Sequence, residues 1–249
     1  MVDQKQIAPF FEGWEETLIW SYLDGSMGYA ITDNEESPAS AQIVVGEFCF
    51  FAGEPNDELV QKPGALFLVP QNEGWRACIE RVWGEGVQKR LRYAIKKEPD
   101  AFDKHKLTRF ANSLGREFSL RLFDEAIVRA SVLEEWSRDF CAQFADAGDF
   151  LARGIGVAAL YQGELVAGAS SYSIYRGGIE IEIDTKPEFR RQGLATACGA
   201  RLILECLSRG LYPSWDAYDL RSVSLAEKLG YHVSHPYVVY ERLKVEPAV

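Results

Sequence analysis

Three carboxylates alternate with three isoleucines in the segment GIEIEIDT. Side chains two positions apart in a β-strand share a face, so Glu180, Glu182 and Asp184 would line one face of a strand. Like charges about 7 Å apart raise one another's pKa, as partial burial would. A carboxylate with a raised pKa suits a general base, and such a face also attracts cations. The segment predicts a proton-accepting site, with a plain solvated face as the alternative.

A second candidate site is the loop that leads into an apolar helix, RRQGLATACGARLILECL. Arg201, Glu205 and Ser208 form the one narrow polar stripe of this helix, so we expect its body to be buried. The first N–H groups of a helix lack partners within it and carry the positive end of the dipole, which stabilises an anion. Gly193 lets a ligand approach the backbone closely. The pattern predicts a phosphate site, with an ordinary exposed turn as the alternative.

Other catalytic and metal-binding patterns are missing from the sequence. The five cysteines show no C-x-x-C spacing and form no zinc pattern with the three histidines, so we expect free buried thiols and no metal. GIGVAA resembles a dinucleotide-binding loop, but it opens a strand where a helix is required. No G-x-S-x-G nucleophile elbow is present.

The elements expected around the two candidate sites form a mixed sheet. A strand in EFSLRLFD is followed by one broken helix or two over residues 125–146. Three strands then follow, joined by tight turns at Gly163 and at Gly177–Gly178, which predicts an antiparallel meander. The apolar helix, a strand in YPSWDAY, a helix in RSVSLAEKLG and a strand in YHVSHPYVVYERL complete the order β-αα-β-β-β-α-β-α-β.

The first half of the chain alternates short strands and helices without a chemical motif. The charged segment KKEPDAFDKHK contains a proline and little apolar character, which is typical of a surface connection. We therefore predict a smaller α/β domain at residues 1–115 and a second domain at residues 116–249. The first would be a degenerate copy of the second fold or a lid over its groove.

The composition limits the classes of molecule that this chain is expected to bind. The chain has 249 residues, of which 47% are hydrophobic, and a formal net charge of -10. This charge argues against a nucleic-acid partner, which needs a basic face, and it suits a cationic small molecule. There is no run of about 18 apolar residues and no basic segment followed by an apolar one at the start. We expect a cytoplasmic protein without a membrane partner, either a monomer or a homodimer.

The spacing R-x-x-G-x-A over residues 190–195, after a strand ending in IDTKPEFR, resembles the acyl-CoA-binding motif of the GNAT superfamily of N-acyltransferases. The element order is similar, and WDAYDLRSVSLAEKLGY resembles the superfamily's second cofactor segment. EIEIDT, YPSWDA and LAEKLGY together resemble the subfamily that includes the zwittermicin A resistance acetyltransferase. The resemblance covers residues 118–240. It implies an α+β fold with a GNAT-like mixed, mostly antiparallel sheet, helices on both of its faces, and acetyl transfer from acetyl-CoA to a primary amine.

The resemblance also implies roles for individual positions. The backbone of residues 183–185 would pair with the pantetheine arm of coenzyme A, and the amides of residues 192–196 would hold the pyrophosphate. The strand before the helix and YPSWDAY should diverge to admit the thioester. The positions assigned to the cofactor are Ile183, Asp184, Thr185, Arg190, Arg191, Gln192, Gly193, Leu194, Ala195, Thr196, Asp219 and Ser222.

Two positions depart from the superfamily's pattern. Asp219 stands where an asparagine is common, and Ala226 stands where many members have a tyrosine that protonates the leaving thiolate. Tyr231 and Tyr218 are the candidates to replace that tyrosine. A coenzyme A thiolate with an ordinary thiol pKa needs little protonation, so the reaction could also proceed without a general acid.

The need for a general base follows from the chemistry of the amine acceptor. An alkyl ammonium has a pKa of about 10, so a group on the enzyme must accept a proton before the amine can attack. Superfamily members often use a glutamate on this strand, which makes Glu180 or Glu182 the expected base; the pattern does not choose between them. An acyl-CoA-binding or interaction module without catalysis is the alternative, and a transferase for longer acyl-CoA is another.

Overall fold

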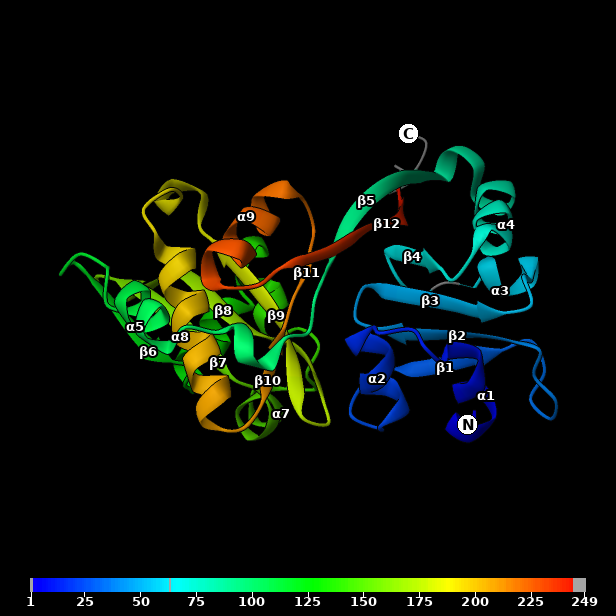
Figure 1. Cartoon of the computed structure of the whole chain (residues 1–249), viewed down its shortest axis with the longest axis horizontal. Helices are drawn as coiled ribbons and strands as arrows, with labels where there is room; N and C mark the ends of the chain where they lie inside the picture. Colours follow the sequence, from blue (N-terminus) through cyan, green and yellow to red (C-terminus); the bar gives the residue numbers. More distant parts are fainter. Residues whose placement is uncertain (1, 63, 244–249) are drawn as a thin grey trace. The chain divides into compact units, whose positions relative to one another are not determined.

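The computed structural model describes residues 2–62 and 64–243 (Figure 1). The chain divides into two compact units, Met1–Arg92 with Pro236–Val249, and Tyr93–His235. The units do not divide at residue 115, because Leu107 is fully buried in the core of the second unit. The compact units are not the same as the predicted domains 1–115 and 116–249, and that division into domains stays a prediction.

The first unit is built on a mixed sheet. Strands β1 to β3 pair antiparallel in sequence order, β3 and β4 pair parallel, and β4 pairs antiparallel with β12. Phe51 stacks on Trp75 with ring centroids 5.2 Å apart in its core. The elements are α1 (Gln4–Ile7), η1 (Ala8–Phe11), α2 (Thr17–Leu23), β1 (Tyr29–Thr32), β2 (Ser40–Val45), β3 (Phe48–Gly53), α3 (Asp57–Val60), β4 (Phe67–Pro70), α4 (Glu73–Trp83), η2 (Gly84–Gly86), β5 (Val87–Ile95) and β12 (Val233–Arg242).

The second unit contains a five-stranded sheet with the order β10-β9-β8-β7-β6. Strands β6 to β9 pair antiparallel, and β10 pairs parallel with β9. The predicted antiparallel meander is therefore present. The elements are η3 (Pro99–Ala101), α5 (Lys104–Ala111), β6 (Phe118–Leu122), α6 (Glu125–Ser131), η4 (Glu135–Phe140), α7 (Ala147–Arg153), β7 (Gly156–Tyr161), β8 (Glu164–Tyr175), β9 (Gly178–Thr185), η5 (Pro187–Phe189), α8 (Leu194–Ser208), β10 (Tyr212–Ser214), β11 (Asp216–Ala217) and α9 (Leu220–Leu229).

Tight turns set the register of the meander. Gln162 and Gly163 have φ angles of 52° and 88°, and Gly177 has a φ of 95°. Left-handed backbone of this kind reverses the chain within two residues, which is why glycine stands at both turns. The register of β8 and β9 shifts once, between Ser171 and Ser173, so a bulge lies beside the middle of β9.

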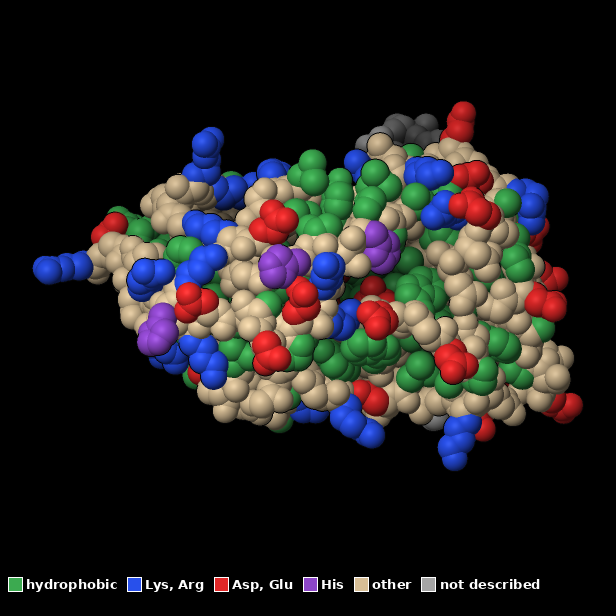
Figure 2. Space-filling model, in the orientation of Figure 1, with side chains coloured by type: hydrophobic (Ala, Val, Ile, Leu, Met, Phe, Trp, Pro, Cys, Tyr) green, Lys and Arg blue, Asp and Glu red, His purple; other side chains and the backbone are tan. Residues whose placement is uncertain are grey.

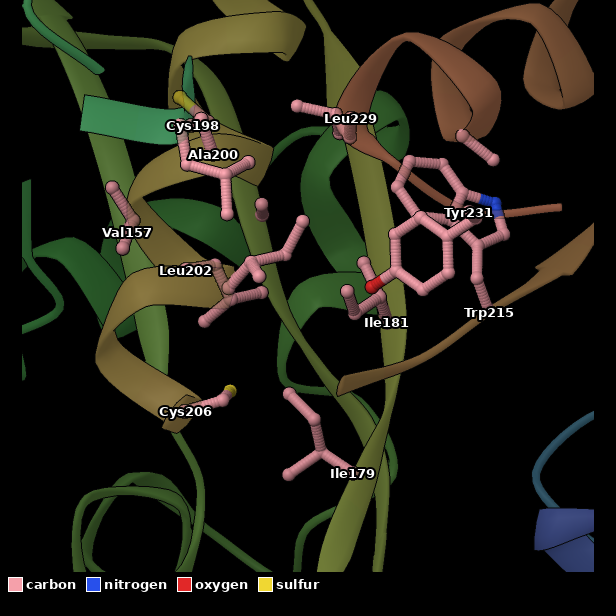
Figure 3. Packing of buried hydrophobic residues seen from close by; sticks show 14 of the residues in the cluster. Val157, Ile179, Ile181, Cys198, Ala200, Leu202, Cys206, Trp215, Leu229 and Tyr231 are labelled. Atoms are coloured by element: carbon pink, nitrogen blue, oxygen red, sulfur yellow. The ribbon is translucent and has the colours of Figure 1, made fainter. Parts of the chain in front are cut away.

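Helix α8 is the centre of the second unit's core. Its buried side chains include Cys198, Leu202 and Cys206, which lie in one cluster with Ile179 and Ile181 of β9 (Figure 3). Burial of apolar surface contributes roughly 25 cal/mol per Å², so this contact fixes the helix against the sheet. The prediction that the body of the helix is buried is confirmed.

The opposite face of this sheet is covered by the segment that the sequence predicts as one broken helix or two. It forms α6, η4 and α7, and η4 contacts β8 and β9. The Ser170 hydroxyl on β8 donates to the Phe140 carbonyl at 2.8 Å, which fixes the end of η4. Helices therefore lie on both faces of the sheet, as predicted.

The segment YPSWDAY differs from its prediction as a single strand. It forms two short strands, and β10 pairs with β9 whereas β11 pairs with the end of β5. The two strands therefore belong to different sheets, and the chain leaves β9 at Trp215. None of the helices in the described part of the chain is both long and apolar enough to cross a membrane.

Candidate functional site

Helix α8 begins without a side-chain cap. Gly193 occupies its N-cap position with a φ of 83°, and no side chain accepts a hydrogen bond from the first-turn amides. Within residues 2–62 and 64–243, each of the other α-helices has a capping side chain. The capping residues are Asp3, Glu16, Asn56, Asn72, Asp103, Asp124, Asp146 and Asp219. The amide donors at the start of α8 are thus left for an external anion.

The loop before α8 is shaped to bring the backbone to such an anion. Arg191 and Gly193 both have left-handed backbone, with φ angles of 65° and 83°. A Cβ added to Gly193 would meet no atom within 4 Å, so the space beside it is open. Successive amides in a concave turn of this kind form an anion-binding site.

The same loop returns to the end of β9. The Arg190 Nε–H donates to the Thr185 carbonyl at 3.0 Å, and Arg190 Nη2 lies 3.5 Å from Asp184 Oδ1. Thr185 Oγ1 is buried and has no hydrogen-bond partner among the described residues. This orphaned hydroxyl and the uncapped helix start fit a phosphorylated ligand that runs from β9 to α8.

Lys228 adds a cation at the helix start that the sequence reasoning did not single out. Its Nζ lies 3.3 Å from the Thr196 hydroxyl, which is nearly buried, and 5.2 Å from the centroid of the Phe110 ring. The lysine was contained in the segment LAEKLGY, yet only the fold brings α9 to the start of α8.

Strands β9 and β10 diverge within the sheet. Their register pairs end at Glu180 and Ser214, whereas β9 continues to Thr185. Beyond Glu180, β9 has no strand partner on this edge among the described residues. The predicted divergence is present, and it leaves the backbone of residues 183–185 open to an extended ligand.

The carboxylate side of β9 is not a plain solvated face. Glu180 is only 7% exposed, and Glu182 and Asp184 are half-buried. Glu180 pairs in register with Ser173 on one side and Ser214 on the other, so the three side chains share one face.

Hydroxyl groups surround Glu180. Tyr175 and Ser214 share a hydrogen bond of 2.8 Å between their hydroxyl oxygens. Burial raises the pKa of Tyr175 to about 12; the bond with Ser214 opposes this shift and the charge of Glu180 adds to it. The proton of Tyr175 is therefore held firmly at neutral pH.

Asp139 of η4 extends the acidic face, and the sequence reasoning missed it. Burial raises the pKa of Asp139; the charge of Arg138 opposes this shift and the charge of Asp184 adds to it. The influence of Asp184 reflects the packing of η4 on β9. No local pattern marks this aspartate, because its proximity to β9 depends on the tertiary fold.

The residues predicted in the second cofactor segment have structural partners. Asp219 caps α9 by accepting from the amides of Arg221 and Ser222, both at 2.9 Å. Burial acts to raise the pKa of Asp219, but these hydrogen bonds and the Arg221 side chain outweigh it and lower the pKa. The Ser222 hydroxyl accepts from Trp215 Nε1 at 3.1 Å. Contact of either residue with a cofactor stays a prediction.

The position that lacks the usual tyrosine is closed. Ala226 is fully buried, and the two candidate replacements differ sharply. Tyr231 is 3% exposed, and its hydroxyl donates to the Pro213 carbonyl at 2.6 Å, whereas Tyr218 is 44% exposed. Burial raises the pKa of Tyr231 well above its ordinary value. Neither tyrosine therefore stands out as a general acid at the point where β9 and β10 diverge.

The cysteines and the groups that could bind a metal were also compared with their predictions. All five cysteines are free and buried. Burial raises the pKa of Cys198 to about 12, which keeps it a thiol. Across the described residues, no group of three or more His, Cys, Asp and Glu side chains is arranged to hold a metal ion.

Comparison with known proteins finds a matching family model and a similar chain. The family model described as GNAT acetyltransferase matches residues 8–240. The uncharacterized N-acetyltransferase YdfB of Bacillus subtilis (strain 168) is 25% identical over 240 residues, which cover 90% of this chain and 89% of the relative.

Two solved structures are also similar to this chain. A GCN5-related N-acetyltransferase-like protein from Streptococcus suis 89/1591 is 44% identical, with a TM-score of 0.93 over 96% of this chain and 98% of that one. A GCN5-related N-acetyltransferase from Kribbella flavida shares the fold at 16% identity, with a TM-score of 0.56 over 87% of this chain and 90% of that one. The mixed α+β, GNAT-like fold predicted from the sequence is confirmed.

Proposed function

The chain belongs to the GNAT acetyltransferase family, and from this premise we propose that it transfers an acetyl group from acetyl-CoA to a primary amine of a small, cationic acceptor. The family implies an acyl-CoA co-substrate. The open edge of β9 and the uncapped start of α8 support acetyl-CoA in that role. Similarity to the zwittermicin A resistance acetyltransferase rests on the three sequence segments alone. We also propose a cytoplasmic protein.

The chain's own groups would hold the co-substrate along one path. The backbone of residues 183–185 pairs with the pantetheine arm, and the amides of residues 192–196 bind the pyrophosphate. Arg190 and Arg191 flank these phosphates, and Lys228 approaches them from α9. When bound, acetyl-CoA supplies a thioester that an amine can attack.

We propose Glu180 as the general base. The observation that supports this choice is its position: it is nearly buried and is the last residue of β9 that pairs with β10. A carboxylate at the divergence can take the proton of the bound ammonium, after which the C–N bond forms as the C–S bond breaks and the nitrogen loses its second proton to water. Backbone N–H groups of β9 stabilise the developing charge on the acetyl oxygen.

The other carboxylates favour a cationic acceptor. Glu182 and Asp184 lie farther along the same face, and Asp139 faces them from η4. Negative charge that is partly removed from water attracts a cation more strongly than exposed charge does. We therefore propose that these three side chains bind and orient the acceptor.

The leaving thiolate needs no acid from the protein in this proposal. The Tyr231 hydroxyl already donates a hydrogen bond to the Pro213 carbonyl, and burial makes release of its proton unfavourable. A thiol has a pKa of about 8.5, so the thiolate can take a proton from water near neutral pH.

The experiment that tests this function measures release of free thiol from acetyl-CoA with a panel of primary amines, polyamines and amino acids. The same panel is run with acyl-CoA substrates of increasing chain length. We expect turnover with acetyl-CoA and a preference for acceptors that carry a second positive charge. Calorimetric binding of coenzyme A without turnover of any amine would instead favour a binding module without catalysis.

A further inference from the structure

A cavity of about 350 Å³ lies away from the proposed acetyl-CoA path, where the end of α5, the edge strand β6 and α8 meet. Its polar lining includes Asn112, Arg121 and Arg201, and its apolar lining includes Phe118, Leu120 and Leu122. None of residues 183–196 lines it. Its volume is at the lower end of the range found for small-molecule sites.

The surroundings of this cavity are basic in an otherwise acidic chain. Residues 104–121 contain Lys104, Lys106, Arg109, Arg116 and Arg121, and Glu117 is the one acid among them, whereas the whole chain has a net charge of -10. In Figure 2, blue Lys and Arg side chains gather over the part of the surface where Figure 1 shows α5 and α8. Such a field concentrates small anions.

Arg201 keeps donors for a ligand. Arg121 lies on the other face of β6 from Phe118, Leu120 and Leu122, and its Nη2 donates to Asp124 at 2.8 Å. Arg201 Nη2 lies 3.5 Å from Glu205, whose carboxylate is bonded more closely by Arg209 at 2.8 Å. A guanidinium has five N–H donors, so one weak exposed pair leaves most of them available.

An apolar wall completes the site. Leu122 is 41% exposed, and Phe118 and Leu120 are half-buried beside it. We propose that this cavity binds a small organic anion, a carboxylate whose charged end contacts Arg201 and whose apolar body lies against Phe118, Leu120 and Leu122. Arginine suits the planar carboxylate because its donors are arranged in a matching fork.

The test is calorimetric titration of the full chain with hexanoate in the presence of saturating coenzyme A, with hexanamide as the uncharged counterpart. We expect hexanoate to bind and hexanamide not to bind. Arg201→Ala should weaken binding by roughly tenfold or more, the effect of losing one charge-assisted hydrogen bond.

The matched control is Arg129→Ala, because Arg129 is exposed, pairs with Glu125 and lies outside the cavity. It should leave the affinity for hexanoate unchanged. Thermal unfolding of both variants reports whether each is folded. Absence of hexanoate binding at millimolar concentration, equal binding of hexanamide, displacement by coenzyme A, or insensitivity to Arg201→Ala would each overturn the proposal. These results do not depend on whether the protein transfers acetyl groups.

Discussion

Glu180 and Ser214 form the last register pair between β9 and β10, and the two strands separate immediately after them. A nearly buried carboxylate therefore stands where a thioester could enter the sheet. The uncapped start of α8 lies farther along the same path, beyond the open part of β9. In the proposed function these three features act as the base, the strand edge and the phosphate site, in the order that acetyl-CoA requires.

Gly193→Glu should abolish coenzyme A binding in calorimetry, because it places a carboxylate in the open space at the start of α8. Gly163→Glu is the matched control: Gly163 also has left-handed backbone, with a φ of 88°, and a Cβ there would meet no atom within 4 Å. Both variants should lose about 1 kcal/mol of folding stability from backbone strain. Equal coenzyme A affinity in the two variants would exclude this loop as the phosphate site.

Lys228→Ala should weaken coenzyme A binding severalfold, and the loss should shrink at high salt because the lysine acts through its charge. Lys106→Ala is the control, since its Nζ lies 5.8 Å from the centroid of the same Phe110 ring and Lys228 adds the contact with Thr196. Coenzyme A titrations of both variants at two ionic strengths distinguish the effects of the two lysines. If Lys106→Ala weakened binding as much as Lys228→Ala, a general charge effect would replace the specific one.

Asp139→Asn should stabilise the protein at neutral pH. Burial raises the pKa of Asp139 in the folded state, so folding favours its protonated form. The penalty for ionising it therefore appears as the pH rises above the ordinary aspartate pKa of about 3.9, and it is absent below that value. Thermal unfolding of Asp139→Asn and of the unmodified protein, at pH 7 and near pH 3.5, measures this difference in stability. A variant no more stable than the unmodified protein at pH 7 would contradict the prediction.

Local patterns predicted much of the second unit. The meander follows from alternating apolar residues and from glycine at Gly163 and Gly177, and the buried helix follows from its narrow polar stripe. The candidate phosphate loop was found because a glycine that permits close approach stands directly before an apolar helix whose first amides lack partners. These features depend on neighbours in sequence, which is why the sequence alone could identify them.

Other features depend on distant partners. YPSWDAY carries one strand pattern, but β10 and β11 pair with strands about 30 and 120 residues earlier, and nothing local specifies that change. Asp139 and Lys228 join the site only through the packing of η4 on β9 and of α9 on α8. Asp219, which departs from the family pattern, caps the start of α9, a role that asparagine fills equally well.

The central claim is that Glu180 is the general base, and the most direct test compares Glu180→Gln with Glu182→Gln. Initial rates of acetyl transfer are measured at pH 7 with the best amine, alongside calorimetric affinity for coenzyme A. We predict that Glu180→Gln lowers kcat by roughly 10²-fold or more, the usual contribution of a general base, and leaves coenzyme A affinity unchanged. Glu182→Gln should mainly raise KM for the acceptor. Full activity in Glu180→Gln, or the larger loss of kcat in Glu182→Gln, would contradict the account.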